Sequence, residues 1–105
     1  MAVIDTTDAD FIQQLKNNNK IIVKYYADWC GTCRLFNPKF KRLSNDERFE
    51  GITFLNINAE ENADARSIGG VTNLPYFAIF KNGVMVEAIT SGKEEPVVEL
   101  IQKLN

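Results

Sequence analysis

A short apolar run that leads directly into a pair of cysteines constrains the fold of this chain more than any other feature. Residues 20–27 (KIIVKYYA) are mostly apolar, β-branched or aromatic, which is typical of a strand buried on both faces at the centre of a sheet. Cys30 and Cys33 follow almost at once and open residues 30–45, where apolar residues recur at helical spacing. These apolar residues are Leu35, Phe36, Phe40 and Leu43. The cysteines are therefore expected where a central strand turns into a helix.

The rest of the chain alternates helices and strands. Thr6 or Thr7 can cap a helix whose apolar face includes Phe11, Ile12 and Leu15, and a short strand can precede it. The remaining elements are expected to be a strand over 52–57, a helix over 62–68, strands over 76–80 and 84–89 joined at Asn82-Gly83, and a helix beginning near Pro96 that buries Val97, Leu100, Ile101 and Leu104. The crossover between the inner strands implies parallel pairing, and the hairpin adds an antiparallel edge. We therefore predict one α/β domain over residues 1–105, a three-layer sandwich with a central mixed β-sheet and helices on both faces.

Size and charge exclude several classes of protein. A chain of 105 residues, 45% of them apolar, suits a single core. The net charge of −2 and the interspersed charges give no reason to expect a nucleic-acid partner. No run approaches the ~18 apolar residues that a membrane span needs. The first fifteen residues lack the basic start and apolar stretch of a secretory signal, so we expect a cytoplasmic protein.

The spacing of the two cysteines predicts redox chemistry. Free N–H groups and the helix dipole favour a thiolate on Cys30 at the helix start, and the thiolate is the reactive form. Cys33 lies three residues later on the same helix face, close to disulfide geometry. Cys30 can attack a substrate disulfide, and Cys33 can then attack Cys30 and release the reduced substrate. Gly31 lets another chain approach closely.

Three other interpretations of the pair stay open at this point. A zinc knuckle needs four ligands, and the chain has no other cysteine and no histidine, so we expect no metal site within one chain. A metal or iron–sulfur cluster shared between two chains is a remoter option. A structural disulfide with so small a ring constrains the unfolded chain little. Two packed core cysteines fit poorly with a Gly-Thr loop before a helix.

Several motifs, in the same order, resemble the thioredoxin family over nearly the whole chain. They are residues 27–34 (ADWCGTCR), Pro38 where family members kink this helix, residues 73–76 (NLPY), residues 80–83 (FKNG) and Gly92. The resemblance implies a thioredoxin fold and a protein-disulfide reductase of cell redox homeostasis and electron transport, with Cys30 as nucleophile and Cys33 as resolving thiol. It implies disulfide-containing proteins as substrates and no bound cofactor. NADPH would recharge the pair through thioredoxin reductase, a flavin enzyme, and the chain would act as a monomer.

The same resemblance assigns supporting residues. The Leu74–Pro75 bond would be cis and lie against the sulfurs, and Leu74 would pair through its backbone with an extended substrate segment. Trp29, Ile57, Pro75 and Gly92 would line a shallow apolar docking surface. The alternatives are a core aromatic for Trp29, a trans proline that starts a strand for Pro75 and, with equal weight, an ordinary core residue for Ile57.

Two departures from the family pattern bear on the chemistry. Thioredoxins usually carry proline where this chain has Thr32, whose N–H and hydroxyl can stabilise a thiolate and favour a less reducing couple. Lys24 stands where thioredoxins usually bury an acid that takes the proton of the resolving thiol, and Phe54 stands where its lysine partner is usual. A charged Lys24 would lower the thiol pKa values, and a neutral one would itself act as the base. The alternative is that Lys24 extends out of the sheet into solvent.

A third departure is that Asn73, Ser91 and Lys93 make the rim of the docking surface more polar than is typical of the family. This polar rim would narrow the set of protein partners. The alternative is neutral sequence variation on exposed loops. Two further functions therefore stay open. One is a more oxidising oxidase, isomerase or dedicated electron relay, which a redox potential would distinguish. The other is a thioredoxin-like docking module whose redox activity is dispensable, and the intact cysteine pair argues against it.

Overall fold

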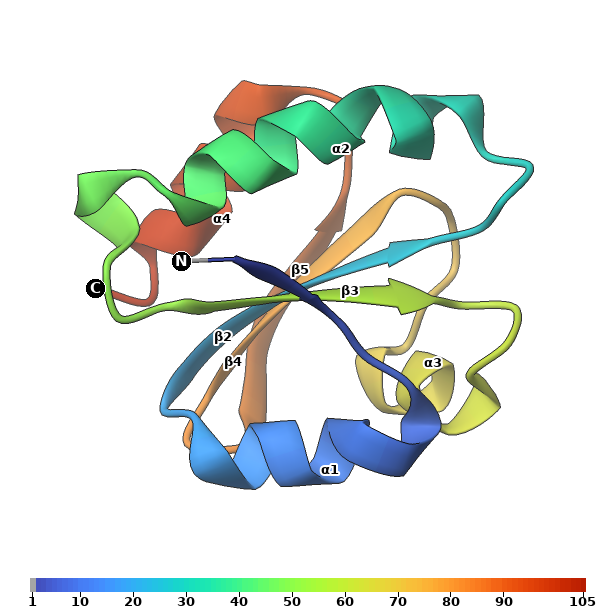
Figure 1. Ribbon diagram of the computed structural model, residues 1–105, viewed down its shortest axis with the longest axis horizontal. Helices are drawn as coiled ribbons and strands as arrows, with labels where there is room; N and C mark the ends of the chain where they lie inside the picture. Colours follow the sequence, from blue (N-terminus) through green and yellow to red (C-terminus); the bar gives the residue numbers. More distant parts are fainter. Residues whose placement is uncertain (1) are drawn as a thin grey trace.

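The crossover and the hairpin that the sequence predicts build one mixed sheet. The computed structural model describes residues 2–105 and places five strands in the order β1-β3-β2-β4-β5 (Figure 1). The strands are β1 (Val3–Asp5), β2 (Lys20–Tyr26), β3 (Thr53–Asn58), β4 (Tyr76–Lys81) and β5 (Val84–Thr90). The helices are α1 (Asp8–Asn17), α2 (Gly31–Ser44), α3 (Ala63–Gly69) and α4 (Glu94–Gln102), with a 3-10 turn, η1, at Glu47–Phe49. The predicted thioredoxin fold is confirmed, whereas η1 was not predicted.

Strand β2 lies at the centre of this sheet. It pairs in parallel with β3 and antiparallel with β4, and β1 and β5 form the two edges. Its five inner residues are buried, as its run of apolar and aromatic residues predicts. The hairpin turn at Asn82 and Gly83 has positive φ at both residues, 53° and 82°, which explains the Asn-Gly pair.

Each face of the sheet carries its own core. Helices α2 and α4 cover one face and α1 and α3 cover the other (Figure 1). The core under α2 and α4 is rich in phenylalanine, with Phe36, Phe40, Phe49, Phe54 and Phe77 all nearly inaccessible. The core under α1 and α3 contains Phe11, Leu15, Tyr25, Ala65 and Tyr76. Helix α2, which starts at the cysteines, is thus anchored by a dense aromatic core.

Some predictions about helix faces and helix ends were wrong. Ile12 was expected on the apolar face of α1 and is 48% exposed, and Leu35, one of the helically spaced apolar residues of α2, is 74% exposed. Both lie at the margin of an apolar stripe, where neighbouring elements cover them only in part. Helix α4 begins at Glu94, two residues before Pro96, because any position in the first turn tolerates a residue without an N–H. Thr7 is the N-cap of α1, but it is the Asn62 side chain that accepts the N–H of Asp8, at 2.8 Å.

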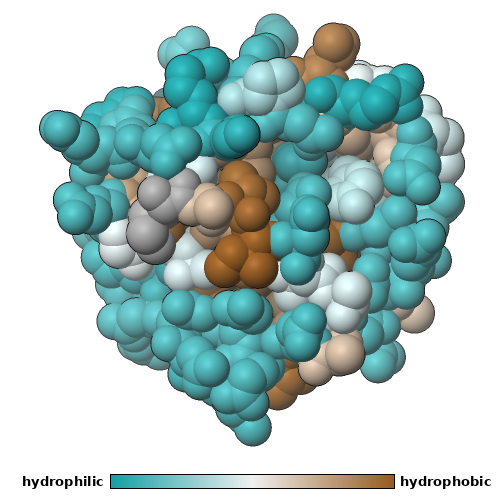
Figure 2. All heavy atoms as spheres, viewed as in Figure 1, coloured by the Kyte–Doolittle hydropathy of each residue, from teal (hydrophilic) through white to brown (hydrophobic). Residues whose placement is uncertain are grey.

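The molecular surface over the β1 edge is mainly polar. Figure 2 shows that hydrophilic residues cover most of this face and that a small hydrophobic area lies near its centre. No helix within residues 2–105 has the length and apolar character needed to cross a membrane.

Candidate active site

The cysteines lie at the carboxyl end of the central strand. Cys30 follows the end of β2 by four residues and is the N-cap of α2. The same end of the sheet receives the start of β4 and the end of β5, because Tyr76 pairs with both Tyr25 and Thr90. Loops at the carboxyl ends of strands are where ligands bind in open α/β sheets. Three loops therefore converge around the cysteine pair.

Cys30 and Cys33 form a disulfide in this structure. The Cys30 Sγ accepts a hydrogen bond from the backbone N–H of Cys33 at 3.1 Å, in the manner of an N-cap side chain. Cys30 is 6% exposed and Cys33 is 1% exposed. After reduction, the same N–H group and the helix N-terminus would favour negative charge on the Cys30 sulfur. The two sulfurs are therefore chemically unequal.

The loop around the cysteines is held from both sides. Arg34 Nη1 donates to the Asp28 carbonyl oxygen at 2.7 Å, which ties the first turn of α2 to the loop that precedes it. On the other side, a Cβ at Gly92 would lie only 2.4 Å from Thr32 Cγ2. The loop after β5 thus packs directly on the residue between the cysteines. A glycine is favoured there because Thr32 fills the space that a side chain would need.

The residues predicted for docking differ in how much surface they present. Trp29 is 66% exposed, Leu74 and Gly92 are half-buried, and Pro75 is buried. The predicted cis bond between Leu74 and Pro75 is confirmed, and the Pro75 carbonyl accepts a hydrogen bond from Thr90 Oγ1 at 2.9 Å. Trp29 is not a core aromatic.

Ile57 belongs to the core and not to the docking surface. It is fully buried, with 0% exposure, in the cluster under α1 and α3. The prediction that Ile57 lines the docking surface was therefore wrong, and the equally weighted core interpretation was right. The reason is its register position on β3, an inner strand covered on both faces.

Lys24 is a buried lysine behind this site. It lies in the middle of β2 and is 1% exposed, so the interpretation that it extends into solvent was wrong. Its Nζ donates to Asn37 Oδ1 at 2.5 Å and lies 5.0 Å from the ring centre of Tyr26. Burial lowers the Lys24 pKa from 10.5 to about 8, although the negative charge of Asp5 acts in the opposite direction. Lys24 is therefore mainly an ammonium at pH 7, but it loses its proton at a lower pH than an exposed lysine.

Two residues around Lys24 were not identified from the sequence. Asn37, one helical turn beyond Cys33, had no local signal because its partner is on another element. Asn56 is the register partner of Lys24, whereas Phe54 pairs with Ile22 and packs on Phe40 at 5.1 Å between ring centres. Hydrophobic alternation along β3 indicates which residues share a face, but the register that pairs β3 with β2 could not be fixed from the sequence.

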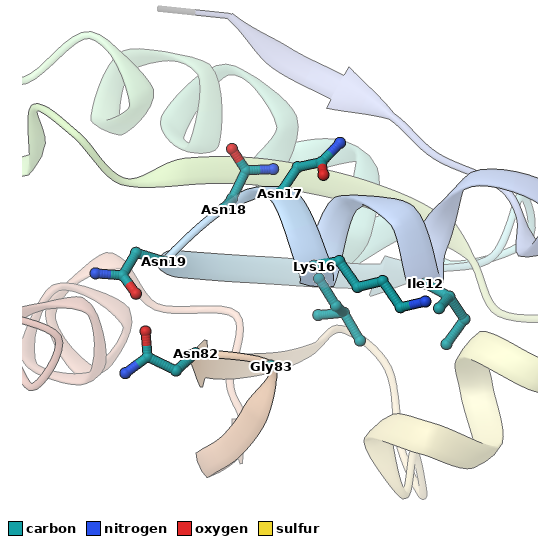
Figure 3. Close-up of a pocket in the computed structure, with 8 residues that line it drawn as sticks. Ile12, Lys16, Asn17, Asn18, Asn19, Asn82 and Gly83 are labelled. Atoms are coloured by element: carbon teal, nitrogen blue, oxygen red, sulfur yellow. The ribbon is translucent and has the colours of Figure 1, made fainter.

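The surface is also hollowed away from the cysteines. One pocket, of about 580 Å³, lies where the end of α1 meets the hairpin turn and is lined by asparagines, Lys16 and Ile12 (Figure 3). It is at the amino end of β2, a full strand length from Cys30, and its lining residues include no cysteine, serine or threonine. Within residues 2–105 no three His, Cys, Asp or Glu side chains are grouped as metal ligands. This pocket is therefore separate from the cysteine pair.

Comparison with known sequences identifies the same chemistry. A model of the Thioredoxin family matches residues 2–104. The thioredoxin of Pyropia yezoensis is 33% identical over 90 residues, which are 85% of this chain and 83% of that protein. Thioredoxin 1 of Plasmodium falciparum is 26% identical over 98% of this chain and 97% of its own length. A peptide-N(4)-(N-acetyl-beta-glucosaminyl)asparagine amidase of Caenorhabditis briggsae is 32% identical over 90% of this chain, but the chain spans only 15% of that protein.

Solved structures agree with this assignment. Plasmodium falciparum thioredoxin superposes with a TM-score of 0.88 at 25% identity, over 96% of this chain and 98% of the other. A thioredoxin f2 solved in complex with ferredoxin:thioredoxin reductase gives a TM-score of 0.88 at 25% identity, over 97% of this chain and 94% of the other. The chain belongs to the thioredoxin family and is a thioredoxin-type thiol–disulfide oxidoreductase whose redox pair is Cys30 and Cys33.

Proposed function

We propose that the chain reduces disulfides in other proteins, with Cys30 as the attacking thiolate and Cys33 as the resolving thiol. The observation that carries this assignment is the inequality of the two sulfurs. Cys30 is the more exposed one and its Sγ accepts the Cys33 N–H, whereas Cys33 is closed to solvent. A thiolate that is reachable and stabilised attacks first.

The proposed reaction transfers two electrons to the substrate. The Cys30 thiolate attacks one sulfur of the substrate disulfide, which forms a mixed disulfide and expels the other substrate sulfur as a thiolate. Cys33 then loses its proton and attacks the Cys30 sulfur. The Cys30–Cys33 disulfide forms, the second substrate thiolate leaves, and both substrate thiolates take up protons. The enzyme pair is oxidised and the substrate disulfide is reduced.

The substrate would dock on the loops that converge at this end of the sheet. Trp29 supplies exposed apolar area, and the half-buried Leu74 and Gly92 leave backbone accessible beside the cysteines. Pro75 supports this surface from below because it is buried. An extended substrate strand pairing with the backbone of Leu74 fits so shallow a surface.

For turnover, the pair must be reduced again. We propose recharging by a flavin thioredoxin reductase supplied by NADPH, with the chain acting as a monomeric domain over residues 1–105 in a reducing compartment such as the cytoplasm. Support for a reductase partner comes from the relative thioredoxin f2, solved in complex with ferredoxin:thioredoxin reductase. The oxidised chain is mixed either with a flavin thioredoxin reductase and NADPH or with ferredoxin:thioredoxin reductase and reduced ferredoxin. The thiols released in each mixture show which of the two reductases recharges the Cys30–Cys33 pair.

The test is reduction of insulin disulfides in the presence of dithiothreitol, followed for the wild type, Cys30→Ser and Cys33→Ser. The wild type should accelerate the reaction, and Cys30→Ser should fall to the uncatalysed rate. Cys33→Ser should accumulate a mixed disulfide on Cys30, visible by mass spectrometry. Activity of Cys30→Ser equal to the wild type would rule out the proposed function.

A second candidate keeps the chemistry and reverses its direction. The N–H bond to Cys30 Sγ stabilises a thiolate, which favours the reduced pair and makes the couple more oxidising. A charged Lys24 close to the pair would act in the same direction. Titration against glutathione buffers decides between the candidates. A potential near the value of about −270 mV that is typical of thioredoxin supports a reductase, and one above about −200 mV supports an oxidase or isomerase.

A further inference from the structure

Helix α2 carries an uneven share of the positive charge of the chain. It holds four of the twelve lysines and arginines and none of the fourteen aspartates and glutamates. The four cations are Arg34, Lys39, Lys41 and Arg42. Three of them are exposed and Lys39 is half-buried, because the buried residues of α2 occupy the other side of the helix. The helix that begins at the cysteines therefore has a positively charged outer side, although the net charge of the chain is −2.

An apolar side chain lies within this charged surface. Leu35 is the most exposed of the large apolar residues that the structure describes. Pro38 and Lys39 follow Leu35 by three and four residues, so they are its neighbours on the helix surface. An apolar centre with a polar rim is the usual composition of a protein–protein interface. We call this surface the basic face of α2, and it consists of Arg34, Leu35, Pro38, Lys39 and Lys41.

The cations of the basic face have no acidic partner, unlike the cation at the far end of the helix. Arg42 forms an ion pair with Glu94 at the start of α4. No ion pair within residues 2–105 involves Arg34, Lys39 or Lys41. The charges closer to the cysteines are therefore the ones that carboxylates of another molecule can complement.

Arg34 connects the basic face to the active site. Its Nη1 donates to the Asp28 carbonyl oxygen at 2.7 Å, and its Nη2 lies 3.8 Å from the position that a Cβ at Gly31 would occupy. The guanidinium thus lies beside the residues between the two cysteines. That hydrogen bond uses one of its five N–H donors, and a guanidinium can bind a carboxylate through two parallel hydrogen bonds. The basic face is therefore continuous with the surface at which a substrate reaches Cys30.

We propose that the basic face of α2 binds an acidic segment of the partner protein while the disulfide of that partner reacts at Cys30. Leu35 supplies the apolar contact, and Arg34, Lys39 and Lys41 select for carboxylates. This inference rests on the proposed function, because it names the class of protein whose disulfide is reduced. Opposite charges would bring such a partner to the cysteines faster than a neutral or basic one.

Acidic residues limit how far a polyanion could extend along this helix. Glu47 lies just beyond the end of α2, and Glu94 and Glu95 begin α4 beside it. These carboxylates would repel the phosphates of a nucleic acid or of a lipid surface that covered the whole helix. A short acidic segment close to Arg34 avoids them. The charge pattern thus favours a protein segment as the occupant.

Two disulfide-containing peptides of equal length test the proposal, one with glutamates and one with lysines beside the disulfide. The rate at which the reduced chain reduces each peptide is measured by stopped flow at about 0.01 M and about 0.5 M salt. The wild type should reduce the acidic peptide roughly tenfold faster at low salt. The difference should nearly disappear at high salt, because salt screens exposed charges. Equal rates with the two peptides at low salt would overturn the proposal.

Variants locate the preference on the helix. Lys39→Gln combined with Lys41→Gln should slow reduction of the acidic peptide about threefold at low salt and should not slow that of the basic peptide. The matched control is Lys16→Gln with Lys81→Gln, which removes the same charge from exposed positions near the amino end of β2 and should keep the preference. Equal losses in the two double variants would overturn the proposal. Leu35→Ser should slow both peptides alike, and unchanged rates would overturn its role in docking.

The failure of this inference is distinguishable from the failure of the proposed function. If the chain is no reductase, neither peptide is reduced at either salt concentration, whereas reduction of both at equal rates overturns the inference alone. Binding to duplex DNA and to vesicles of anionic phospholipid is measured in parallel at low salt. Equal peptide rates, together with polyanion binding that Lys39→Gln with Lys41→Gln abolishes, would overturn the proposal and assign the basic face to a polyanion.

Discussion

The two faces of the sheet each bury an apolar cluster but treat polar groups differently. Under α1 and α3, the two tyrosine hydroxyls are hydrogen-bonded: Tyr25 Oη donates to the Ala65 carbonyl at 2.8 Å and Tyr76 Oη to the Gly69 carbonyl at 2.7 Å. Burial raises the pKa of Tyr25, so this hydroxyl stays uncharged across the working pH range. Under α2 and α4, a core rich in phenylalanine surrounds one lysine. The face that carries the cysteines is thus the one that can titrate.

This difference suggests a division of work. The face under α1 and α3 contributes stability that is independent of pH, and the face under α2 and α4, which also carries the helix of the redox pair, buries a costly charge. Functional sites commonly break a rule of packing that the rest of the molecule obeys. The following variants test whether the two faces separate in this way, starting with the largest expected effect.

The largest expected effect is the loss of an aromatic ring from the cysteine-bearing face. Phe40 packs on Phe54 and Phe77 at 5.1 Å and 5.9 Å between ring centres and also lies under the Lys24 Nζ. Phe40→Ala should lower the free energy of unfolding by about 3–5 kcal/mol, measured by urea titration. The matched control is Leu35→Ala on the same helix, which is 74% exposed and should change it by less than about 0.5 kcal/mol. Equal effects of the two variants would contradict the described packing.

Removal of the buried charge should stabilise the protein. Below about pH 8, Lys24 is protonated in both the folded and the unfolded chain, so the folded state bears the full cost of burying the ammonium. Lys24→Met should therefore raise the free energy of unfolding at pH 7 by up to about 3 kcal/mol. Between pH 8 and 10.5 the unfolded chain binds the extra proton, so the wild type gains stability and the difference should shrink. Urea titrations at pH 7 and pH 10 measure the difference in free energy of unfolding between Lys24→Met and the wild type. A difference that is larger at pH 10 than at pH 7 would contradict a lowered Lys24 pKa in the folded protein.

A comparable disturbance on the opposite face should change stability alone. A Cβ at Gly69 would lie 2.6 Å from Tyr25 Oη, and the Tyr25 ring cannot retreat because the Ala65 carbonyl holds it. Gly69→Ala should cost about 1–2 kcal/mol, since overpacking outweighs the better helix propensity of alanine. The thiolate titration of Cys30 should stay at its wild-type value. A shifted titration would show that the two faces are coupled after all.

The smallest expected effect is at the contact between the two loops of the active site. Gly92→Ala brings a Cβ against Thr32 Cγ2, but Thr32 is exposed and can turn away, so the cost should be about 0.5–1 kcal/mol. Combining it with Thr32→Ser, which removes the obstructing methyl group, should recover most of this loss. A double-mutant cycle by thermal unfolding measures the coupling, and purely additive effects would mean that the two loops do not touch.

Much of this architecture was predictable because its signals are local. The buried run of β2, the helix start at Cys30, the Asn82-Gly83 turn and the buried residues of α4 each follow from spacing and residue type over a few positions. The cis bond at Pro75 was expected through the resemblance to thioredoxins, since the residues alone favour trans.

The errors arose where the answer depends on which element covers a residue. Ile57 looks like a surface candidate by family position, yet it lies on an inner strand and is fully buried. Ile12 and Leu35 fit a helical stripe, but neighbouring elements cover them only in part. The hydrogen bond between Lys24 and Asn37 joins a strand to a helix, and no pattern within either segment indicates it. In each case the outcome depends on which elements pack together in the tertiary structure, and this packing leaves no signal in a short stretch of sequence.

The unequal roles of the two cysteines are tested most directly by competitive alkylation of the fully reduced protein. Limiting iodoacetamide is added over a range of pH, and mass spectrometry of the peptides reports the rate at each sulfur. Cys30 should be modified at least roughly tenfold faster than Cys33 and should stay reactive at lower pH, because it is the more exposed thiol and the Cys33 N–H stabilises its thiolate. Equal rates, or faster modification of Cys33, would contradict the assignment of Cys30 as the nucleophile.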